Sequence, residues 1–289
     1  MKPIGSSELV LNSDGSVYHL NLKPEHLATN VITVGDPDRV DLVASFFDKK
    51  EFETRKREFH TITGTYKGTR FTVISTGIGP DNIDIVLNEL DALVNIDLEK
   101  RTVKEQLTSL NIVRIGTSGS LHADIPVDSF VMGKYGLGLD GLLYYYKSAE
   151  VRELQMEKDF LEQTGWLPEM PRPYIVANSD ELTRRLESDI IYKGITATAG
   201  GFYGPQGRVL RIPLADPHMH DKLHKFRAGE YKVTNFEMET AAIYGLAKLL
   251  GHHACSMNAI IANRKTLDFT SDYHKVIKDL IAYVLDQLA

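Results

Sequence analysis

Residues 30–39 read Asn-Val-Ile-Thr-Val-Gly-Asp-Pro-Asp-Arg, and this stretch decides the fold. The run Val-Ile-Thr-Val at 31–34 is typical of a buried strand, and Gly-Asp-Pro-Asp is a strand-to-turn signal. A helical pattern follows over residues 38–47. We therefore expect a strand, a tight turn and a helix in succession, which is the repeating unit of an α/β protein.

The same alternation continues along the chain. Strands are predicted at residues 30–35, 59–66, 70–76, 111–116, 128–134, 173–177, 194–199 and 254–262. Helices are predicted at residues 38–47, 81–97, 151–164, 179–190, 216–227, 236–250 and 272–288. No internal repeat or linker divides the sequence, so residues 1–289 are predicted to form a single domain. Within it, residues 1–17 are an N-terminal extension, and the charged stretch 98–110 is predicted to be a peripheral helical insertion.

Composition restricts the classes of partner. The chain has 289 residues, 43% of them hydrophobic, and a net charge of −6. This charge gives no general attraction for nucleic acid or an anionic membrane, so a phosphate site has to be local. The sequence contains neither a membrane-length apolar run nor the apolar core of a signal peptide. With Cys255 as its one cysteine, the chain is expected to work in the reducing cytoplasm, with this thiol buried and inert.

Two glycine-containing segments are suited to binding an anion. Gly35 lies between a predicted strand and helix, and Arg39 falls in the first turn of that helix. Arg114 ends another predicted strand, and Thr117 lies in the turn after it. Backbone N–H groups and guanidinium forks together suit a phosphate dianion. The alternative is a plain turn in which Arg39 pairs with a nearby aspartate. The pattern is neither a Walker loop nor a dinucleotide fingerprint, so nucleoside triphosphates and dinucleotides are not expected.

Residues 201–208, Gly-Phe-Tyr-Gly-Pro-Gln-Gly-Arg, carry a second polar pair. The carboxamide of Gln206 offers an acceptor and two donors, whereas the guanidinium of Arg208 offers donors only. Held two residues apart, they suit a flat ring whose edge alternates carbonyl, N–H and carbonyl, as uracil does. The alternative is an ordinary polar surface loop.

Six segments in order resemble the uridine phosphorylases of the nucleoside phosphorylase family. They are residues 35–39, 56–59, 114–119, 201–208, 235–240 and 261–264. The resemblance runs from about residue 18 to the C-terminus. It implies a single-domain α/β/α sandwich with a central mixed, partly barrel-like sheet. It also implies reversible phosphorolysis of uridine, with deoxyuridine and thymidine as further candidate substrates, to uracil and α-ribose 1-phosphate.

The resemblance assigns phosphate binding to Gly35, Arg39, Arg114 and Thr117, with Arg57 supplied by a neighbouring subunit. An alkali cation near Glu58 occurs in some members of the family and is left open here.

For the ribose, the resemblance assigns the cis hydroxyls to Glu239, next to Glu237, and sugar packing to Met238. His19 corresponds to a histidine that reaches the ribose 5′-hydroxyl in the adjacent subunit. The alternative for the two acids is that they complement the dipole of the helix predicted at 236–250.

For the base, the resemblance assigns stacking to Phe202 and polar contacts to Gln206, Arg208 and Arg264. The last three residues, together with Arg114, form the predicted catalytic set. Purine-specific relatives carry an aspartate where this chain has Asn263-Arg264. Because a departing pyrimidine develops negative charge on its carbonyl oxygens, cationic and amide donors suit it.

The predicted partners are a nucleoside and phosphate, with no organic cofactor, nucleic acid or membrane. The resemblance implies a homo-oligomer of at least two subunits, with a hexamer built as a trimer of dimers as the expected form. Three alternatives remain: a purine nucleoside phosphorylase, a nucleosidase and a non-catalytic nucleoside-binding protein. Histidines at 218, 220 and 224, near Asp216, also raise the option of a metal site, against the simpler interpretation of a solvated helix.

Overall fold

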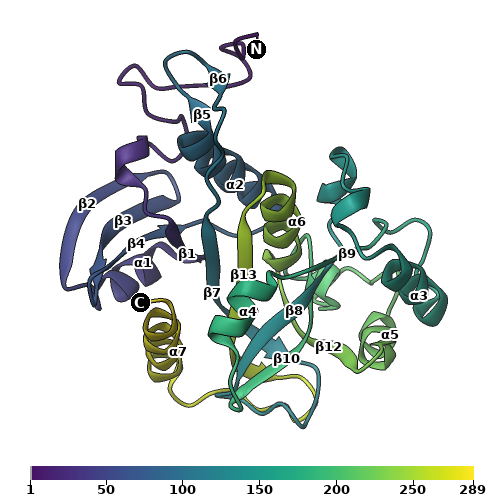
Figure 1. The fold of residues 1–289 in the computed structure, drawn as a ribbon. Coiled ribbons are helices and arrows are strands. Elements are labelled where there is room, and N and C mark those ends of the chain that lie inside the picture. The colour runs from purple at the N-terminus through teal and green to yellow at the C-terminus, as the bar shows by residue number, and fades with distance from the viewer. Residues whose placement is uncertain (1) are drawn as a thin grey trace.

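A computed structural model describes residues 2–289 and shows helices packed around a large mixed sheet (Figure 1). The strands are β1 (Asn30–Val34), β2 (Lys49–Lys56), β3 (Phe59–Tyr66), β4 (Thr69–Ser75), β5 (Ile96–Asp97), β6 (Thr102–Val103), β7 (Asn111–Ser120), β8 (Phe130–Gly138), β9 (Tyr174–Ala177), β10 (Ile191–Thr198), β11 (Arg227–Ala228), β12 (Tyr231–Glu237) and β13 (His253–Asn263). The α-helices are α1 (Pro37–Ala44), α2 (Pro80–Asn95), α3 (Leu154–Thr164), α4 (Asp180–Leu186), α5 (Met219–Lys225), α6 (Thr240–Leu250) and α7 (Tyr273–Leu288). Short 3₁₀ turns include η4 (Gly204–Gln206).

The main sheet is partly closed into a barrel. Its strand order is β11-β12-β10-β8-β13-β7-β1-β4-β3-β2, and β9 pairs with β8. A further pairing of β12 with β7 closes a ring through β10, β8 and β13. Strands β4, β1, β7 and β13 run parallel, whereas β12 meets β7 in the antiparallel sense. The predicted mixed α/β fold with a barrel-like sheet is confirmed.

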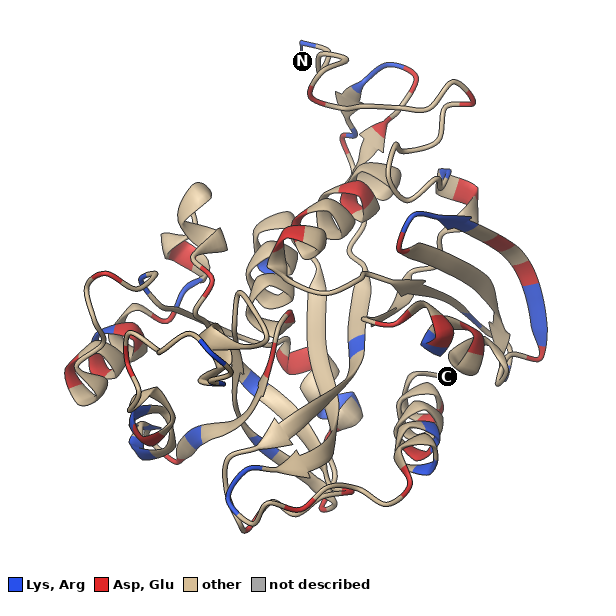
Figure 2. Ribbon diagram, turned by 180° about the vertical axis from the view of Figure 1, so that it is seen from behind, with Lys and Arg blue, Asp and Glu red and all other residues tan. Residues whose placement is uncertain are grey.

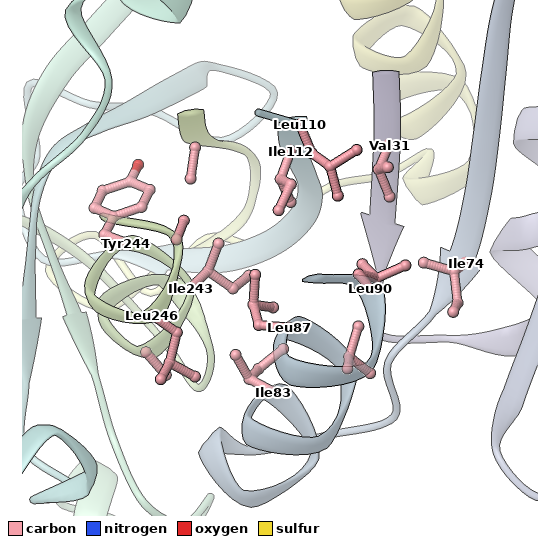
Figure 3. Packing of buried hydrophobic residues seen from close by; sticks show 14 of the residues in the cluster. Val31, Ile74, Ile83, Leu87, Leu90, Leu110, Ile112, Ile243, Tyr244 and Leu246 are labelled. Carbon is pink, nitrogen blue, oxygen red and sulfur yellow. The ribbon is translucent and has the colours of Figure 1, made fainter. Parts of the chain in front are cut away.

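Local sequence explains where the helices begin. Asp36 caps α1 by accepting a hydrogen bond from the backbone N–H of Asp38, and Pro37 occupies the first turn, where no N–H is needed. Ser179 caps α4 in the same manner through the N–H of Leu182. The apolar faces of α2 and α6 then pack together against the sheet, with Leu87 and Ile243 at their contact (Figure 3). These two helices hold the loops that follow β4 and β12.

The buried residues form separate clusters on the two faces of the sheet. One lies under α2 and α6, and a second joins α1, α4 and α7 to strands β1, β4 and β13. Cys255 belongs to the second cluster, and burial raises the pKa of its thiol to about 12, as expected of an inert cysteine. None of the helices in residues 2–289 is long and apolar enough to cross a membrane.

The prediction of a helix over residues 98–110 is wrong. Strands β5 and β6 form a short antiparallel pair there, and the chain is extended from the end of β6 to β7. Arg101 takes a left-handed conformation in the turn, and its guanidinium donates to the carbonyls of Ile4, Gly5 and Leu9. The stretch lacks an apolar face that a helix could bury, and its charged residues serve a turn that binds the N-terminal segment.

Besides the two-residue strands β5, β6 and β11, the longer strands β2 and β12 were not predicted, for different reasons. β2 is an edge strand with basic residues at both ends and acidic residues between them (Figure 2), so it lacks the apolar pattern of a buried strand. β12 occupies a stretch whose last residues were assigned to the helix predicted at 236–250. That helix begins at Thr240, and Glu237 is the last residue of β12.

Candidate functional site

Arg114 is the buried cation at the centre of the candidate site. It lies on β7 beside Thr33 of β1, and only 6% of it is exposed. Gly116 makes room for its side chain, because a Cβ at that position would stand 1.8 Å from Arg114 Nη1. The same nitrogen donates a hydrogen bond of 2.9 Å to Asn258 Oδ1 on β13. Residues of β7 and β13 therefore hold the guanidinium in place.

Two buried carboxylates face Arg114. Its Nη2 lies 2.5 Å from Glu239 Oε2 and 3.3 Å from Glu237 Oε2. Burial alone would lower the pKa of Arg114, but the two carboxylates outweigh burial and raise it. Burial also raises the pKa of Glu237, against the opposing effect of Arg114. The guanidinium thus stays charged, and the group has two acids for one base.

Glu237 is held by donors from its own turn and from β10. Its carboxylate accepts hydrogen bonds from the backbone N–H groups of Glu239 and Thr240 and from the hydroxyl of Thr198. These bonds cap α6 and leave the carboxylate saturated. The helix-dipole interpretation therefore accounts for Glu237 in part, although the residue itself ends a strand.

Glu239 differs in the direction of its side chain. Its Oε1 accepts a 2.9 Å hydrogen bond from the backbone N–H of Gly79, in the loop between β4 and α2, and its Oε2 faces Arg114. Each oxygen keeps a second lone pair. Met238, between the two acids, is half-buried. Glu239 thus joins two loops and retains capacity to accept from a ligand.

Arg39 approaches the same region from α1. Its guanidinium donates to the Tyr273 hydroxyl and lies 3.4 Å from the carbonyl of Ile115, which follows Arg114 on β7. It forms no ion pair with an acid in residues 2–289, so the alternative of an aspartate partner is not supported. Gly35 begins the loop between β1 and α1, and Thr117 lies three residues beyond Arg114. Because β1 and β7 run parallel with Thr33 opposite Arg114, all four predicted phosphate residues of this subunit lie around the C-terminal end of β1, with Arg114 and Thr117 inside β7.

Arg57 and His19 lie elsewhere, around the ring of Tyr18. Arg57 is an exposed residue in the β2–β3 turn, with φ of 55°, and its guanidinium is 5.8 Å from the Tyr18 ring centroid. The His19 ring packs edge-on against Tyr18 at 4.9 Å, and its Nδ1 lies 2.6 Å from Glu89 Oε1. Within residues 2–289 neither side chain bonds to Arg114 or to the groups around it.

Within residues 2–289, Glu58 does not belong to a cluster of three side chains that could hold a metal ion. Its carbonyl accepts a hydrogen bond from Ser75, and its side chain is exposed. In residues 2–289, the group of three potential metal ligands that lie close together is Asp41, Glu53 and His60. The two nitrogens of His60 face different carboxylates, Nε2 toward Glu53 and Nδ1 toward Asp41. This arrangement suits an ion-paired histidine, because a single ion cannot use both nitrogens of one ring.

The segment 201–208 forms a loop that turns at η4 and buries Gln206, which is 3% exposed. Arg208 Nη1 donates to Gln206 Oε1 and to the Phe202 carbonyl, each at 2.6 Å. The Arg208 guanidinium also covers one face of the Phe202 ring, at 3.8 Å from its centroid. The ring is 51% exposed, so its other side remains open to a ligand.

Arg264 joins this loop from the end of β13. Its Nη2 lies 3.2 Å from Gln206 Oε1, and its Nη1 donates to the Gln206 carbonyl at 3.0 Å. Burial and, to a smaller extent, the nearby Arg208 lower the pKa of Arg264 to about 10. Arg264 also crosses close to Gly119 of β7. The structure thus gathers two cations and a carboxamide next to the strand that carries Arg114, and no acid among residues 2–289 is in contact with them.

Asn263 has a structural task. Its Nδ2 donates to the carbonyls of His122 and Ile125, and its Oδ1 accepts from the N–H groups of Lys265 and Thr266. All its hydrogen-bonding capacity is used in shaping the turn that directs Arg264.

The histidines considered as a metal site do not come together. Asp216 pairs with Lys222, His224 stacks on His122 at 4.3 Å, and His220 turns toward Gln206. The alternative of a metal site there is not supported by this geometry.

The family follows from a match over nearly the whole chain. The model of the phosphorylase superfamily matches residues 29–288. The chain belongs to this superfamily and is an enzyme of it. The resemblance read from the six sequence segments is therefore confirmed.

Similar proteins include enzymes named uridine phosphorylase and enzymes named purine nucleoside phosphorylase. The uridine phosphorylase of Thermococcus kodakarensis is 30% identical over 270 residues, which cover 91% of this chain and 83% of that one. A DeoD-type purine nucleoside phosphorylase of Listeria monocytogenes is 26% identical, over 93% of this chain and 97% of its own. A nucleoside phosphorylase of Trypanosoma brucei, described as showing uridine phosphorylase activity, has the same fold with a TM-score of 0.87. It is 31% identical, over 97% of this chain and 99% of that one.

Several residues that hold the site together were not predicted. They are Thr198, Asn258 and Tyr273, which bind Glu237, Arg114 and Arg39. Asn258 offered a signal, because a lone amide within the apolar run of β13 needs a buried partner. A tyrosine near the start of a C-terminal helix offers no comparable signal.

Proposed function

We propose that this chain catalyses the reversible phosphorolysis of uridine, giving uracil and α-ribose 1-phosphate. The observation that carries the proposal is the group of Gln206, Arg208 and Arg264, which offers donors and one amide acceptor with no acid in contact. A pyrimidine with two carbonyls and one N–H fits that set, whereas a purine that needs a proton at N7 finds no carboxylic acid there.

Without a base, these groups satisfy one another. Gln206 Oε1 accepts from both guanidiniums. On binding uracil, N3–H would donate to this oxygen, and a uracil carbonyl would replace it as acceptor for one guanidinium. Each protein hydrogen bond is thus exchanged for one to the base, so no buried polar group is left unpaired.

Bond cleavage would then follow the charge distribution. As the C1′–N1 bond breaks, its electron pair moves into the uracil ring and onto its carbonyl oxygens, where Arg208 and Arg264 stabilise it. The ribose gains oxocarbenium character beside the anionic Glu239. An oxygen of hydrogen phosphate, held by Arg39 and Arg114, forms the new bond to C1′ with inversion. The proton that the phosphate loses ends on N1 of uracil, so atoms and charge balance.

A second subunit completes this proposal. Arg57 and His19 both carry unused donor or acceptor groups at the Tyr18 ring, away from Arg114. Glu89 binds Nδ1 of His19, which leaves Nε2 as an acceptor for a ribose 5′-hydroxyl. We infer a homodimer as the smallest active unit, with a trimer of dimers as the expected assembly. The function requires phosphate as a co-substrate and no organic cofactor, and the cation near Glu58 remains an expectation.

The test is release of free base from uridine, 2′-deoxyuridine, cytidine and inosine, with and without phosphate. We expect phosphate-dependent release of uracil and very slow cleavage of cytidine, whose amino group and N3 reverse two contacts. Faster cleavage of inosine would indicate a purine enzyme, and release without phosphate would indicate a nucleosidase. Tight binding of uridine with no cleavage would indicate a nucleoside-binding protein.

A further inference from the structure

His220 on α5 lies directly against the loop that carries Gln206. Its Nε2 is 2.6 Å from the Gln206 backbone carbonyl and 3.1 Å from Arg264 Nη1. A carbonyl oxygen only accepts, so Nε2 carries the hydrogen and donates it. Arg264 Nη1 donates to the same carbonyl at 3.0 Å. The Gln206 carbonyl oxygen thus links the loop to helix α5 through His220 and to the end of β13 through Arg264.

The loop is also shaped to fit this ring. Gly207 takes a left-handed conformation with φ of +70°, and a Cβ on it would stand 2.2 Å from the Cδ2 and Nε2 atoms of His220. On its other side the ring packs against Phe236 of β12, with centroids 5.7 Å apart. Only a glycine allows the backbone to approach the ring this closely.

The charges around His220 favour its neutral form. The charged groups that face it are Arg264 from the turn after β13, Arg208 from the loop and Asp221 beside it on α5. Burial lowers the pKa of His220, the bond to Gln206 opposes this, and the two arginines lower the pKa further. The ring is therefore neutral near pH 7, with its hydrogen on Nε2.

Few other bonds hold the Gln206 turn in place. The backbone bonds of Gln206, Gly207 and Arg208 go to Tyr203 and Gly204 within the loop. Beyond Arg208 the chain exposes the apolar side chains of Val209, Leu210 and Ile212. Met219 packs beside Gly207, and the polar contacts that tie the turn to α5 and to the sheet are those with His220 and Arg264.

We propose that His220 is a positioning residue for base recognition. By donating to the Gln206 carbonyl it fixes the turn so that Gln206, Arg208 and Arg264 meet the same edge of the base. His220 itself touches neither the base nor the phosphate group. This inference rests on the proposed function, and it predicts that loss of His220 weakens nucleoside binding and leaves phosphate binding unchanged.

The kinetic test compares His220→Leu, which removes the donor, with His220→Gln, whose amide N–H reaches the position of Nε2. We expect His220→Leu to raise KM for uridine by roughly tenfold, the effect of one lost hydrogen bond, with KM for phosphate unchanged. His220→Gln should restore KM for uridine. His218→Leu is the matched control, because His218 is exposed at the start of the same helix and no contact of its side chain is part of the site. Equal increases in both KM values would overturn the proposal.

The second readout needs no substrate. Trypsin cuts after Arg208 and Arg211, so its rate at these bonds reports how firmly the turn is held. We expect faster cutting in His220→Leu and in Gly207→Ala, which breaks the same contact from the other side, but not in His220→Gln or His218→Leu. An unchanged rate in His220→Leu would overturn the proposal. If the wild-type protein does not cleave uridine, the proposed function fails, while the tryptic comparison still decides whether His220 holds the loop.

Discussion

The two halves of the candidate site are built on opposite principles. Around Arg114 the groups are buried, lie on or beside strands, and pair a cation with two acids. Around Gln206 two cations share one amide oxygen on a loop, with no acid in contact and with the neighbouring Phe202 half exposed. The first half contains more acids than the one base they face, whereas the second lacks an anion.

This difference suits the charges that each half would meet during phosphorolysis. The ribose becomes cationic, and a centre with excess carboxylate attracts it, while Arg39 and Arg114 retain the phosphate. The base becomes anionic and meets the half that has no acid. Because both halves are organised before the substrate arrives, little reorganisation is required as the charges develop.

The largest effects on turnover and stability are expected from two single substitutions, each of which removes a cation from one half. In Arg114→Leu, Glu237 and Glu239 stay buried without a cationic partner, so we expect a loss of roughly 3–5 kcal/mol in the free energy of unfolding together with loss of turnover. Arg208→Leu should also lose turnover but cost at most about 1 kcal/mol, because it lies on a partly exposed loop. Urea denaturation and turnover assays measure both quantities. Equal destabilisation by the two changes would end the distinction between the halves.

Mixing of inactive subunits tests which half is shared between chains. Arg57→Ala and Arg208→Ala subunits should each be inactive alone. In mixed dimers one site would combine intact Arg57 from one chain with intact Arg208 from the other. Random exchange of equal amounts should then restore about a quarter of wild-type activity, since half of the dimers are mixed and each has one working site. Mixed dimers without recovery would show that Arg57 acts in its own subunit.

In the half of the site around Arg114, the sequence predicted the functional residues more completely than the residues that hold them in place. Strand β7 combines an apolar run with Arg114, so local pattern and function coincide there. The turn predicted after Arg114 is wrong, because Thr117 and its neighbouring glycines continue β7 to Ser120. The residues that hold Arg114 and Arg39, such as Asn258 and Tyr273, lie far away in sequence. Their pairing depends on the order of the strands, which no local pattern specifies.

The failures of the sequence analysis have physical causes too. The charge of residues 98–110 suggests a solvated helix, but a helix needs an apolar face to bury, and this stretch lacks one. The polar motif at residues 237–239 predicts the start of a helix, but Glu237 is also the last residue of β12, and the helix begins only at Thr240. The spacing of His220 and His224 is compatible with a shared metal ion, but spacing does not reveal that the two rings face different neighbours.

A smaller, substrate-selective effect is expected at Glu239. Glu239→Gln keeps an oxygen for the Gly79 N–H but loses the charge that we propose binds the ribose hydroxyls. We expect kcat/KM for uridine to fall roughly tenfold more than for 2′-deoxyuridine, which already lacks one hydroxyl partner. Steady-state kinetics on both nucleosides measure the ratio. Equal losses would mean that Glu239 only balances Arg114 and joins the two loops.

The smallest expected effect is a pH dependence of the free energy of unfolding, which arises from His122 near the half of the site around Gln206. His122 follows β7, donates through Nε2 to the Val233 carbonyl at 2.9 Å and stacks on His224. Burial, with help from Lys232 and His224, lowers its pKa from 6.5 to about 4. The folded state therefore favours the neutral ring, so its contribution is complete above pH 6.5 and is lost as the pH falls toward 4. His122→Gln keeps an N–H donor but does not titrate, so its urea midpoint should fall less than that of the wild type over this range. Parallel curves for the two proteins would show that His122 titrates alike in the folded and unfolded states. In that case the turn that directs Arg264, whose Asn263 side chain donates to the His122 carbonyl, would gain no pH sensitivity from this histidine.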